Sequence, residues 1–180
     1  MRALDRLLQR WRIRKAVPWI RPGDRLLDIG CYDRSLIDRV GDRVDSAVGV
    51  DVDVSPVDDG KVRLLRGRFP NDFSFDPGSF DCVTSLAVLE HVEDPNAFAQ
   101  ACNQVLAGGG RVVLTVPHPF VDRILAVLLF LRLIKGMHAE EHHGFDVFET
   151  VPIFEGAGFR LLKHRRFQLG LNHLFVFDKP

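Results

Sequence analysis

The sequence predicts an alternating α/β protein built on a doubly wound, mostly parallel sheet of seven strands with an antiparallel strand at the C-terminal edge. Short continuous apolar runs, such as residues 25–29, alternate with segments of helical spacing. This alternation is typical of parallel strands that are covered by helices on both faces. The last two apolar runs are joined by a short turn at residues 169–172 instead of a helix, which favours an antiparallel pair.

Each element follows from its local pattern. Strands are expected at 25–29, 46–52, 61–67, 80–86, 111–117, 159–167 and 172–179. Helices are expected at 3–16, 34–40, 95–106, 121–134 and 147–155. Asp33 and Asp94 are candidate N-cap residues, and Pro95 suits the first position of a helix. The glycine-rich residues 107–110 are expected to end the third helix.

Length and composition indicate one domain, 1–180, with a basic helix in residues 1–20 and an apolar insert in residues 119–146. The 24 Lys and Arg balance the 24 Asp and Glu, so overall charge gives no indication of nucleic acid. The three cysteines form no CxxC pair, which suits a reducing cytosol. No secretory signal is visible, and apolar residues 124–131 fall short of the roughly 20 needed to span a bilayer. We expect a cytoplasmic protein.

The first helix carries leucines and Trp11 at helical spacing, with arginines on its other face. One interpretation is a helix packed on the domain with a solvated basic face. The alternative is a peripheral contact with a membrane surface or a polyanion.

The stretch LLDIGCYDRS, residues 26–35, places Gly30 directly after the first strand. In an open α/β sheet, ligands bind beyond the carboxyl ends of the strands, beside the first strand. Asp51 ends the second strand, 21 positions beyond Gly30. This offset matches the acid that binds ribose hydroxyls in nucleotide-binding Rossmann-like sheets. The alternative role for Asp51 is a turn or capping acid, with Asp53 as a substitute at the ribose.

The run FSFDPGSFDCVTSLAVLEHVEDP, residues 73–95, continues through LAGGGRVVLTVPHP to EGAGF. It resembles the class I S-adenosylmethionine-dependent methyltransferases, in particular the group with a GSFD…LEHVEDP pattern. The resemblance is close over residues 24–118 and loose over 140–178. It implies the Rossmann-like fold of that superfamily and S-adenosylmethionine as the cofactor.

The resemblance also implies which residues contact the cofactor. The positions are Asp28, Gly30, Cys31, Tyr32, Asp51, Val52, Arg68, Phe69 and Leu86. In the family, Asp51 would hold the ribose hydroxyls and Val52 would pack on the adenine. Leu86 would lie near the methionine and the sulfonium.

Two departures from the family pattern bear on this site. The first loop of the family reads D-x-G-x-G-x-G, whereas Tyr32 and Arg34 stand at the later glycines here. Tyr32 would cover the methionine carboxylate, and Arg34 would either pair with that carboxylate or block the turn. Arg68 or Phe69 stands where the family has an acid for the adenine amino group, so backbone groups and Phe69 would replace that acid.

Methyl transfer to a hydroxyl benefits from a general base, and histidine is the usual candidate near neutral pH. His91 and His118 are the candidates next to the fourth and fifth strands, and a structural role is the alternative for His91. Three further histidines fall in residues 119–146, where the resemblance implies a variable substrate lid: His138, His142 and His143. An alternative interpretation is a metal site formed by Glu90, His91 and His118. Related metal-binding enzymes have an acidic ligand at the position of Ala87, and alanine cannot bind a metal. We therefore expect no metal.

The sequence thus predicts an S-adenosylmethionine-dependent enzyme that methylates an oxygen, or else a nitrogen or carbon, of a small-molecule or lipid-linked acceptor. The apolar insert at 119–146 would pack on the domain, form a homodimer or contact an apolar substrate. A non-catalytic scaffold with a degenerate cofactor loop is the first alternative function. An RNA methyltransferase that uses the arginine-rich first helix is the second.

Overall fold

The computed structural model describes residues 3–118 and 145–180. The predicted helix at 121–134, the predicted homodimer contact through the insert, and His138, His142 and His143 lie outside the described residues. Within the described ranges, no helix is long and apolar enough to cross a membrane.

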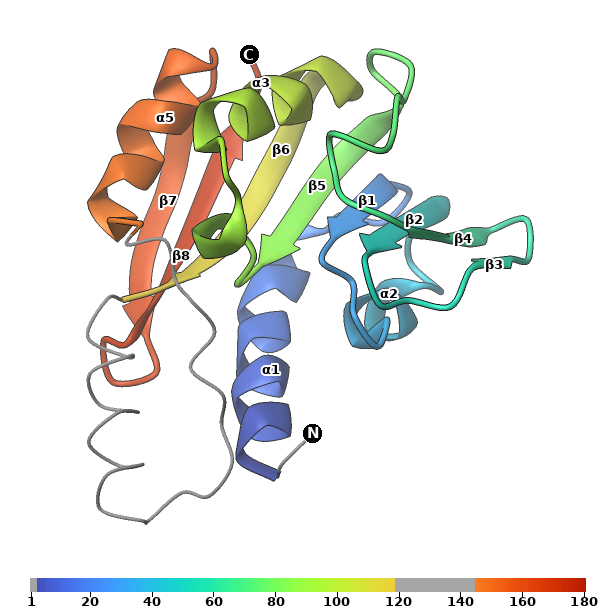
Figure 1. The fold of residues 1–180 in the computed structure, drawn as a ribbon, viewed down its shortest axis with the longest axis horizontal. Helices are drawn as coiled ribbons and strands as arrows, with labels where there is room; N and C mark the ends of the chain where they lie inside the picture. Colours follow the sequence, from blue (N-terminus) through green and yellow to red (C-terminus); the bar gives the residue numbers. More distant parts are fainter. Residues whose placement is uncertain (1–2, 119–144) are drawn as a thin grey trace.

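An eight-stranded sheet forms the centre of the fold, in the order β3-β4-β2-β1-β5-β6-β8-β7 (Figure 1). The strands are β1 (Arg25–Ile29), β2 (Ser46–Asp51), β3 (Val57–Asp58), β4 (Val62–Arg66), β5 (Phe80–Leu86), β6 (Leu106–Pro117), β7 (Arg160–Phe167) and β8 (Asn172–Asp178). Strands β4, β2, β1, β5 and β6 run parallel, and β8 runs antiparallel to both β6 and β7. The predicted fold class is confirmed.

The sheet has one strand more than the seven expected, because β3 pairs antiparallel with β4 at the far edge. Both residues of β3 are exposed, and two residues are too few to produce a detectable pattern. The C-terminal hairpin also inserts β8 between β6 and β7, so that β7 forms the edge.

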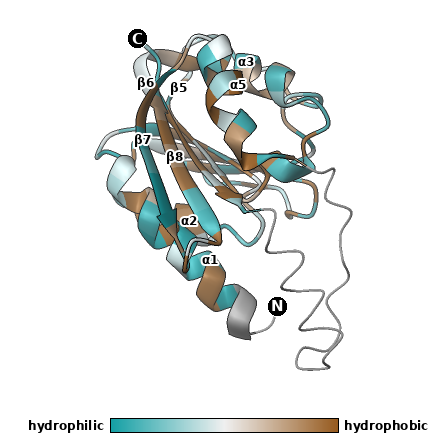
Figure 2. Ribbon diagram, turned by 90° about the vertical axis from the view of Figure 1, so that its left-hand side faces the viewer, coloured by the Kyte–Doolittle hydropathy of each residue, from teal (hydrophilic) through white to brown (hydrophobic). Residues whose placement is uncertain are grey.

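Helices cover both faces of the sheet (Figure 2). Helices α1 (Ala3–Ala16) and α2 (Ser35–Val40) lie on one face, and α3 (Pro95–Val105) and α5 (Thr150–Gly156) lie on the other. Single 3-10 turns occur at η1 (Val17–Trp19), η2 (Leu89–His91) and η3 (Val147–Glu149). Leu26 belongs to the core beside α1 and α2, and its neighbour Leu27 belongs to the core beside α3. Burial on both faces explains why the central strands read as continuous apolar runs.

Two local predictions need correction. The N-cap of α2 is Arg34 and not Asp33, although the Asp33 carboxylate still accepts the Ser35 N–H at 3.2 Å. Residues 107–110 do not end α3 but belong to β6, which begins at Leu106. Its register on β5 shifts between Phe80, which pairs with Leu106, and Cys82, which pairs with Arg111. The glycine-rich residues therefore interrupt the regular pairing of β6 with β5. The predicted cap at Asp94 is confirmed by its bond to the Ala97 N–H.

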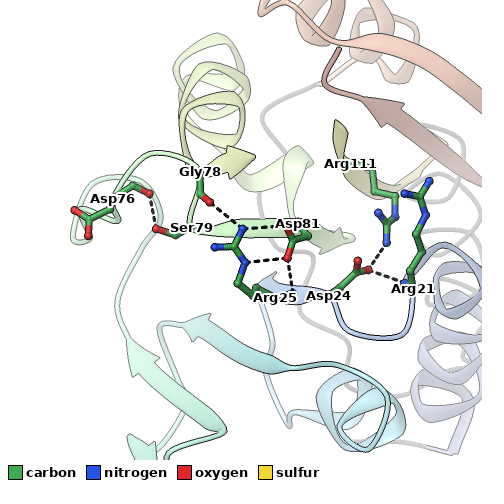
Figure 3. Close-up of polar contacts among 8 residues, drawn as sticks. All are labelled: Arg21, Asp24, Arg25, Asp76, Gly78, Ser79, Asp81 and Arg111. Atoms are coloured by element: carbon green, nitrogen blue, oxygen red, sulfur yellow. Dashed lines mark hydrogen bonds and ion pairs between the residues drawn. The ribbon is translucent and has the colours of Figure 1, made fainter. Parts of the chain in front are cut away.

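Two ion pairs join the amino ends of the central strands (Figure 3). Asp24, just before β1, accepts from the Arg111 guanidinium on β6 and from the Arg21 N–H. Arg111 also donates to the Trp19 carbonyl. Asp24 and Arg111 are only 6% and 3% exposed, so neither charge can be solvated by water. Next to them, Arg25 binds Asp81 through two nitrogens and holds the pKa of that carboxyl below its usual value.

We predict that Arg111→Met lowers the free energy of unfolding by about 3–5 kcal/mol, because it leaves the buried Asp24 carboxylate without a counter-charge. Urea denaturation measures this change. Arg63→Gln is the control, since the Arg63–Asp58 pair is more than half exposed and should change the value by less than about 1 kcal/mol. Equal stabilities of the two variants would contradict the role assigned to the buried pair.

Candidate active site

The turn after β1 is held against β2 by backbone hydrogen bonds. The Gly30 and Cys31 N–H groups both donate to the Val50 carbonyl, at 2.8 and 3.2 Å. Gly30 has a φ of +75°, and a Cβ there would stand 2.2 Å from Cγ2 of Val88. Glycine is therefore required by conformation and by space, because the loops after β1 and β5 touch at this point.

The two residues that replace the expected glycines adopt the conformation that glycine favours. Tyr32 and Arg34 have φ angles of 45° and 56°, which lie in the left-handed region. The Arg34 guanidinium donates to Asp38 at 2.8 Å, so its side chain runs along α2 and does not block the turn. The loop backbone thus has the glycine-type conformation although two of the glycines are missing.

Asp51 links the end of β2 to this turn. Its Oδ2 accepts the Tyr32 N–H and its Oδ1 accepts the Asp53 N–H, both at 2.9 Å. A carboxylate oxygen can accept more than one hydrogen bond. Each oxygen of Asp51 therefore retains acceptor capacity for a vicinal diol. Beside it, Val52 is 48% exposed and offers an apolar surface to a flat ring.

Asp28 lies beneath the turn and is 3% exposed. Burial raises its pKa to about 7, and the 2.6 Å hydrogen bond from the Thr84 hydroxyl opposes that shift. The negative charges of Asp51 and Asp33 make smaller contributions to this raised value. Burial also raises the pKa of the Cys31 thiol to about 12, so this cysteine stays protonated and packs as a small apolar residue.

The remaining predicted cofactor positions lie after β4 and β5. Arg68 is exposed, and its N–H donates to the Asp72 carboxylate at 2.7 Å. The Phe69 ring is only 8% exposed and meets the Phe98 ring edge-on in the core. It is therefore not available to cover an adenine, which corrects the expectation for that side chain. Leu86 packs against the core beside α1 and α2.

Helix α1 reaches the same end of the sheet. The Gln9 side chain donates to Asp33 in the turn after β1 at 2.8 Å. The Gln168 side chain, from the turn between β7 and β8, donates to the Leu8 carbonyl at 3.0 Å. The helix therefore connects the candidate cofactor turn to the C-terminal hairpin.

The two predicted catalytic histidines occupy different settings. His91 is exposed at the end of η2, and His118 is half-buried directly after β6. The His118 ring lies 5.5 Å from that of His173 on β8. Sequence reasoning missed His173 and His164, whose Nδ1 and Nε2 atoms are 2.9 Å apart. Only the register of the hairpin could have revealed this pair. No group of three or more potential metal ligands occurs in residues 3–118 and 145–180.

Known proteins share this architecture. Residues 2–164 match a family model described as a methyltransferase domain. A ubiquinone biosynthesis O-methyltransferase of Pseudomonas aeruginosa (strain LESB58) is 29% identical over 130 residues, which are 64% of this chain and 56% of that protein. The chain thus spans about half the length of the curated relatives it matches.

Solved structures agree at the level of the fold. An S-adenosylmethionine-dependent methyltransferase from Mesorhizobium loti superposes with a TM-score of 0.68 at 18% identity, covering 87% of this chain and 91% of that one. The complex between the Haloferax volcanii Trm112 methyltransferase activator and a methyltransferase gives a TM-score of 0.73 at 17% identity, covering 94% and 90%.

The matched residues include the turn at Gly30, the acid at Asp51 and the sheet that brings them together. The chain therefore belongs to the methyltransferase domain family, and it has the fold of S-adenosylmethionine-dependent methyltransferases.

Proposed function

We propose that this protein transfers a methyl group from S-adenosylmethionine to an oxygen of a small or lipid-linked acceptor. The observation that carries the proposal is the Asp51 carboxylate, which lies beside the turn after β1 and retains acceptor capacity on both oxygens. When bound, S-adenosylmethionine supplies a methyl group that is already activated on a sulfonium. The protein then has to align the acceptor oxygen and provide a destination for its proton.

The residues present suit this cofactor. Asp51 would accept from the two ribose hydroxyls, and Val52 would pack on the adenine. The tight turn at Gly30 would let the backbone approach the methionine part. Tyr32 and Arg34 do not argue against binding, because their backbone already has the left-handed conformation.

Oxygen as the methylated atom is supported by the relatives, which are named ubiquinone biosynthesis O-methyltransferases. That name describes those proteins, and its extension to this chain is part of the proposal. We infer a phenolic hydroxyl as the simplest acceptor of this kind.

Exposed apolar side chains support an acceptor with an apolar part. Most of the large exposed apolar residues belong to α1, the turn after β1, η3 and the turn between β7 and β8. They are Leu7, Trp11, Tyr32, Phe148 and Leu169. Arg6 and Arg10 on α1 are also exposed, and cations beside apolar side chains suit an anionic membrane surface that presents a lipid-linked acceptor.

The first test is calorimetric titration with S-adenosylmethionine and S-adenosylhomocysteine. Asp51→Ala should weaken binding by about 10- to 100-fold, because hydrogen bonds to a charged group contribute about 1.5–3 kcal/mol. Asp42→Ala is the matched control, since it removes an exposed carboxylate that precedes β2 and lies at the opposite end of that strand from Asp51. An equal loss in both variants would contradict the role of Asp51, and no binding by the wild type would favour a scaffold function.

A second prediction concerns the turn itself. Arg34→Gly should leave the free energy of unfolding unchanged or raise it by up to about 1 kcal/mol, because glycine adopts a positive φ without strain. Arg34→Val should lower it by about 1–2 kcal/mol, because a β-branched residue is disfavoured there. Urea denaturation compares the two variants, and calorimetry should show that the glycine variant still binds S-adenosylhomocysteine. Equal stability of the two variants would count against the left-handed conformation.

A further inference from the structure

Three imidazoles lie side by side at the carboxyl end of β6. His118 follows β6, His173 is the second residue of β8, and His164 lies on β7. The ring centroids of His118 and His173 are 5.5 Å apart, and those of His173 and His164 are 5.1 Å apart. Because β8 runs antiparallel to β6, its first residues lie at the end of the sheet where the candidate cofactor turn also lies.

His173 joins a buried position to the surface. Its ring is fully buried, whereas His164 is exposed. The Nδ1 of His173 forms a hydrogen bond with the Nε2 of His164 at 2.9 Å. The Nε2 on the other side of the His173 ring is buried and has no hydrogen-bond partner within residues 3–118 and 145–180.

An unpaired nitrogen in such a position indicates a ligand atom. Leaving a buried polar group without a partner costs about 1–3 kcal/mol. The neighbouring rings of Phe148 and Phe175, with centroids 6.2 and 5.9 Å away, offer no strong hydrogen-bonding group. They do suit an aromatic acceptor, which would stack on or pack against them.

The position also suits an acceptor rather than the cofactor. Adjacent strands are about 4.8 Å apart, and β8 is separated from β5 by β6. His173 therefore lies about 10 Å across the sheet from β5. This separation places His173 away from the turn after β1 that would hold the cofactor.

Both histidines of the pair are neutral near pH 7. The pKa of His173 is lowered to about 4, mainly by burial, with smaller contributions from His164, Arg166 and His118. Burial and Arg166 also lower the pKa of His164. A neutral imidazole has one N–H and one lone pair, so the pair can pass a proton without forming a buried cation.

The charges on the surrounding elements are few. Strand β7 contributes Arg166, and His118 follows β6. The segment at η3, which packs Phe148 on the His173 ring, carries Asp146 and Glu149, and both are exposed. The pair therefore has no buried counter-ion from this segment that would favour an imidazolium.

We propose that His173 is the general base of the methyl transfer and that His164 relays the proton to solvent. This inference rests on the proposed function, with a phenolic hydroxyl as the acceptor. The acceptor O–H bond breaks, and its proton goes to Nε2 of His173. The Nδ1 proton of His173 moves to Nε2 of His164, and a proton leaves Nδ1 of His164 to water. The oxygen keeps the electron pair of its O–H bond and forms the new O–C bond with it, while the bond between the methyl group and the sulfonium breaks and leaves its electron pair on the sulfur.

The first test needs no turnover. Long-range ¹H–¹⁵N correlation spectra distinguish the two neutral imidazole tautomers, with His164→Gln and His173→Gln used for assignment. The relay requires His173 to carry its proton on Nδ1 at pH 7, which leaves the lone pair on Nε2. A proton on Nε2, or a charged His173 ring at pH 7, would overturn the proposal whatever the acceptor is.

The second test uses S-adenosylmethionine with 4-nitrocatechol as the phenolic probe. His164→Gln should lower kcat at least tenfold at pH 6 with little change in KM. The difference from wild type should close as pH rises, because an ionised phenol needs no base. Arg165→Gln is the control, since Arg165 pairs with Leu174 on the other face of the hairpin, and it should match wild type.

The outcomes separate the two proposals. Lack of turnover by wild type contradicts the proposed function with a phenolic acceptor, whereas the spectra still decide the state of the histidine pair. If wild type turns over and His164→Gln has the same kcat at every pH, the relay is wrong. A deficit in His164→Gln that stays constant with pH indicates a structural role and also overturns it.

Discussion

Val88 fills the space that a side chain at position 30 would need, and this contact sets the shape of the site. It brings the loop after β5 against the loop after β1 and leaves only glycine at that point. The chain then turns at once, and the Val50 carbonyl near the end of β2 accepts the N–H groups of Gly30 and Cys31. Three strand ends are thereby fixed relative to one another before any ligand arrives, so little ordering is left for the cofactor to induce.

The second half of the site comes from segments that are distant in sequence. Helix α1 and the turn between β7 and β8 are joined through Gln168, and α1 is joined to the cofactor turn through Gln9. These are single hydrogen bonds on polar side chains, in contrast to the buried Asp24–Arg111 pair at the opposite end of the sheet. A buried ion pair thus stabilises the amino end of the sheet, while single side-chain hydrogen bonds connect these segments at the carboxyl end. This difference suits the proposed function, in which the carboxyl end would admit two substrates and release two products.

Most of the fold could be predicted because the central strands are buried on both faces and their sequences are therefore continuous apolar runs. The place of Asp51 at the end of β2 was predictable from a different pattern, its offset of 21 residues from Gly30, and its contact with the ribose stays a prediction. The sequence could not show that Tyr32 and Arg34 adopt positive φ, because left-handed backbone at non-glycine residues depends on what surrounds the turn. Phe69 was assigned to the adenine from its place after β4, yet packing against Phe98 decides its position. The His164–His173 pair depends on the register of β7 on β8, and residue patterns alone do not specify that register.

The place of β8 in the sheet also constrains how the protein assembles. Strand β7 precedes β8 in the chain but contacts the rest of the sheet only across β8. During synthesis, residues 160–167 therefore emerge with no sheet partner, and β6 keeps an open edge of unpaired backbone groups until residues 172–178 follow. Strand β7 can therefore join the sheet only once β8 is present. For that interval the nascent chain presents an apolar edge, which is the form most prone to pairing with another chain and most suited to recognition by a chaperone.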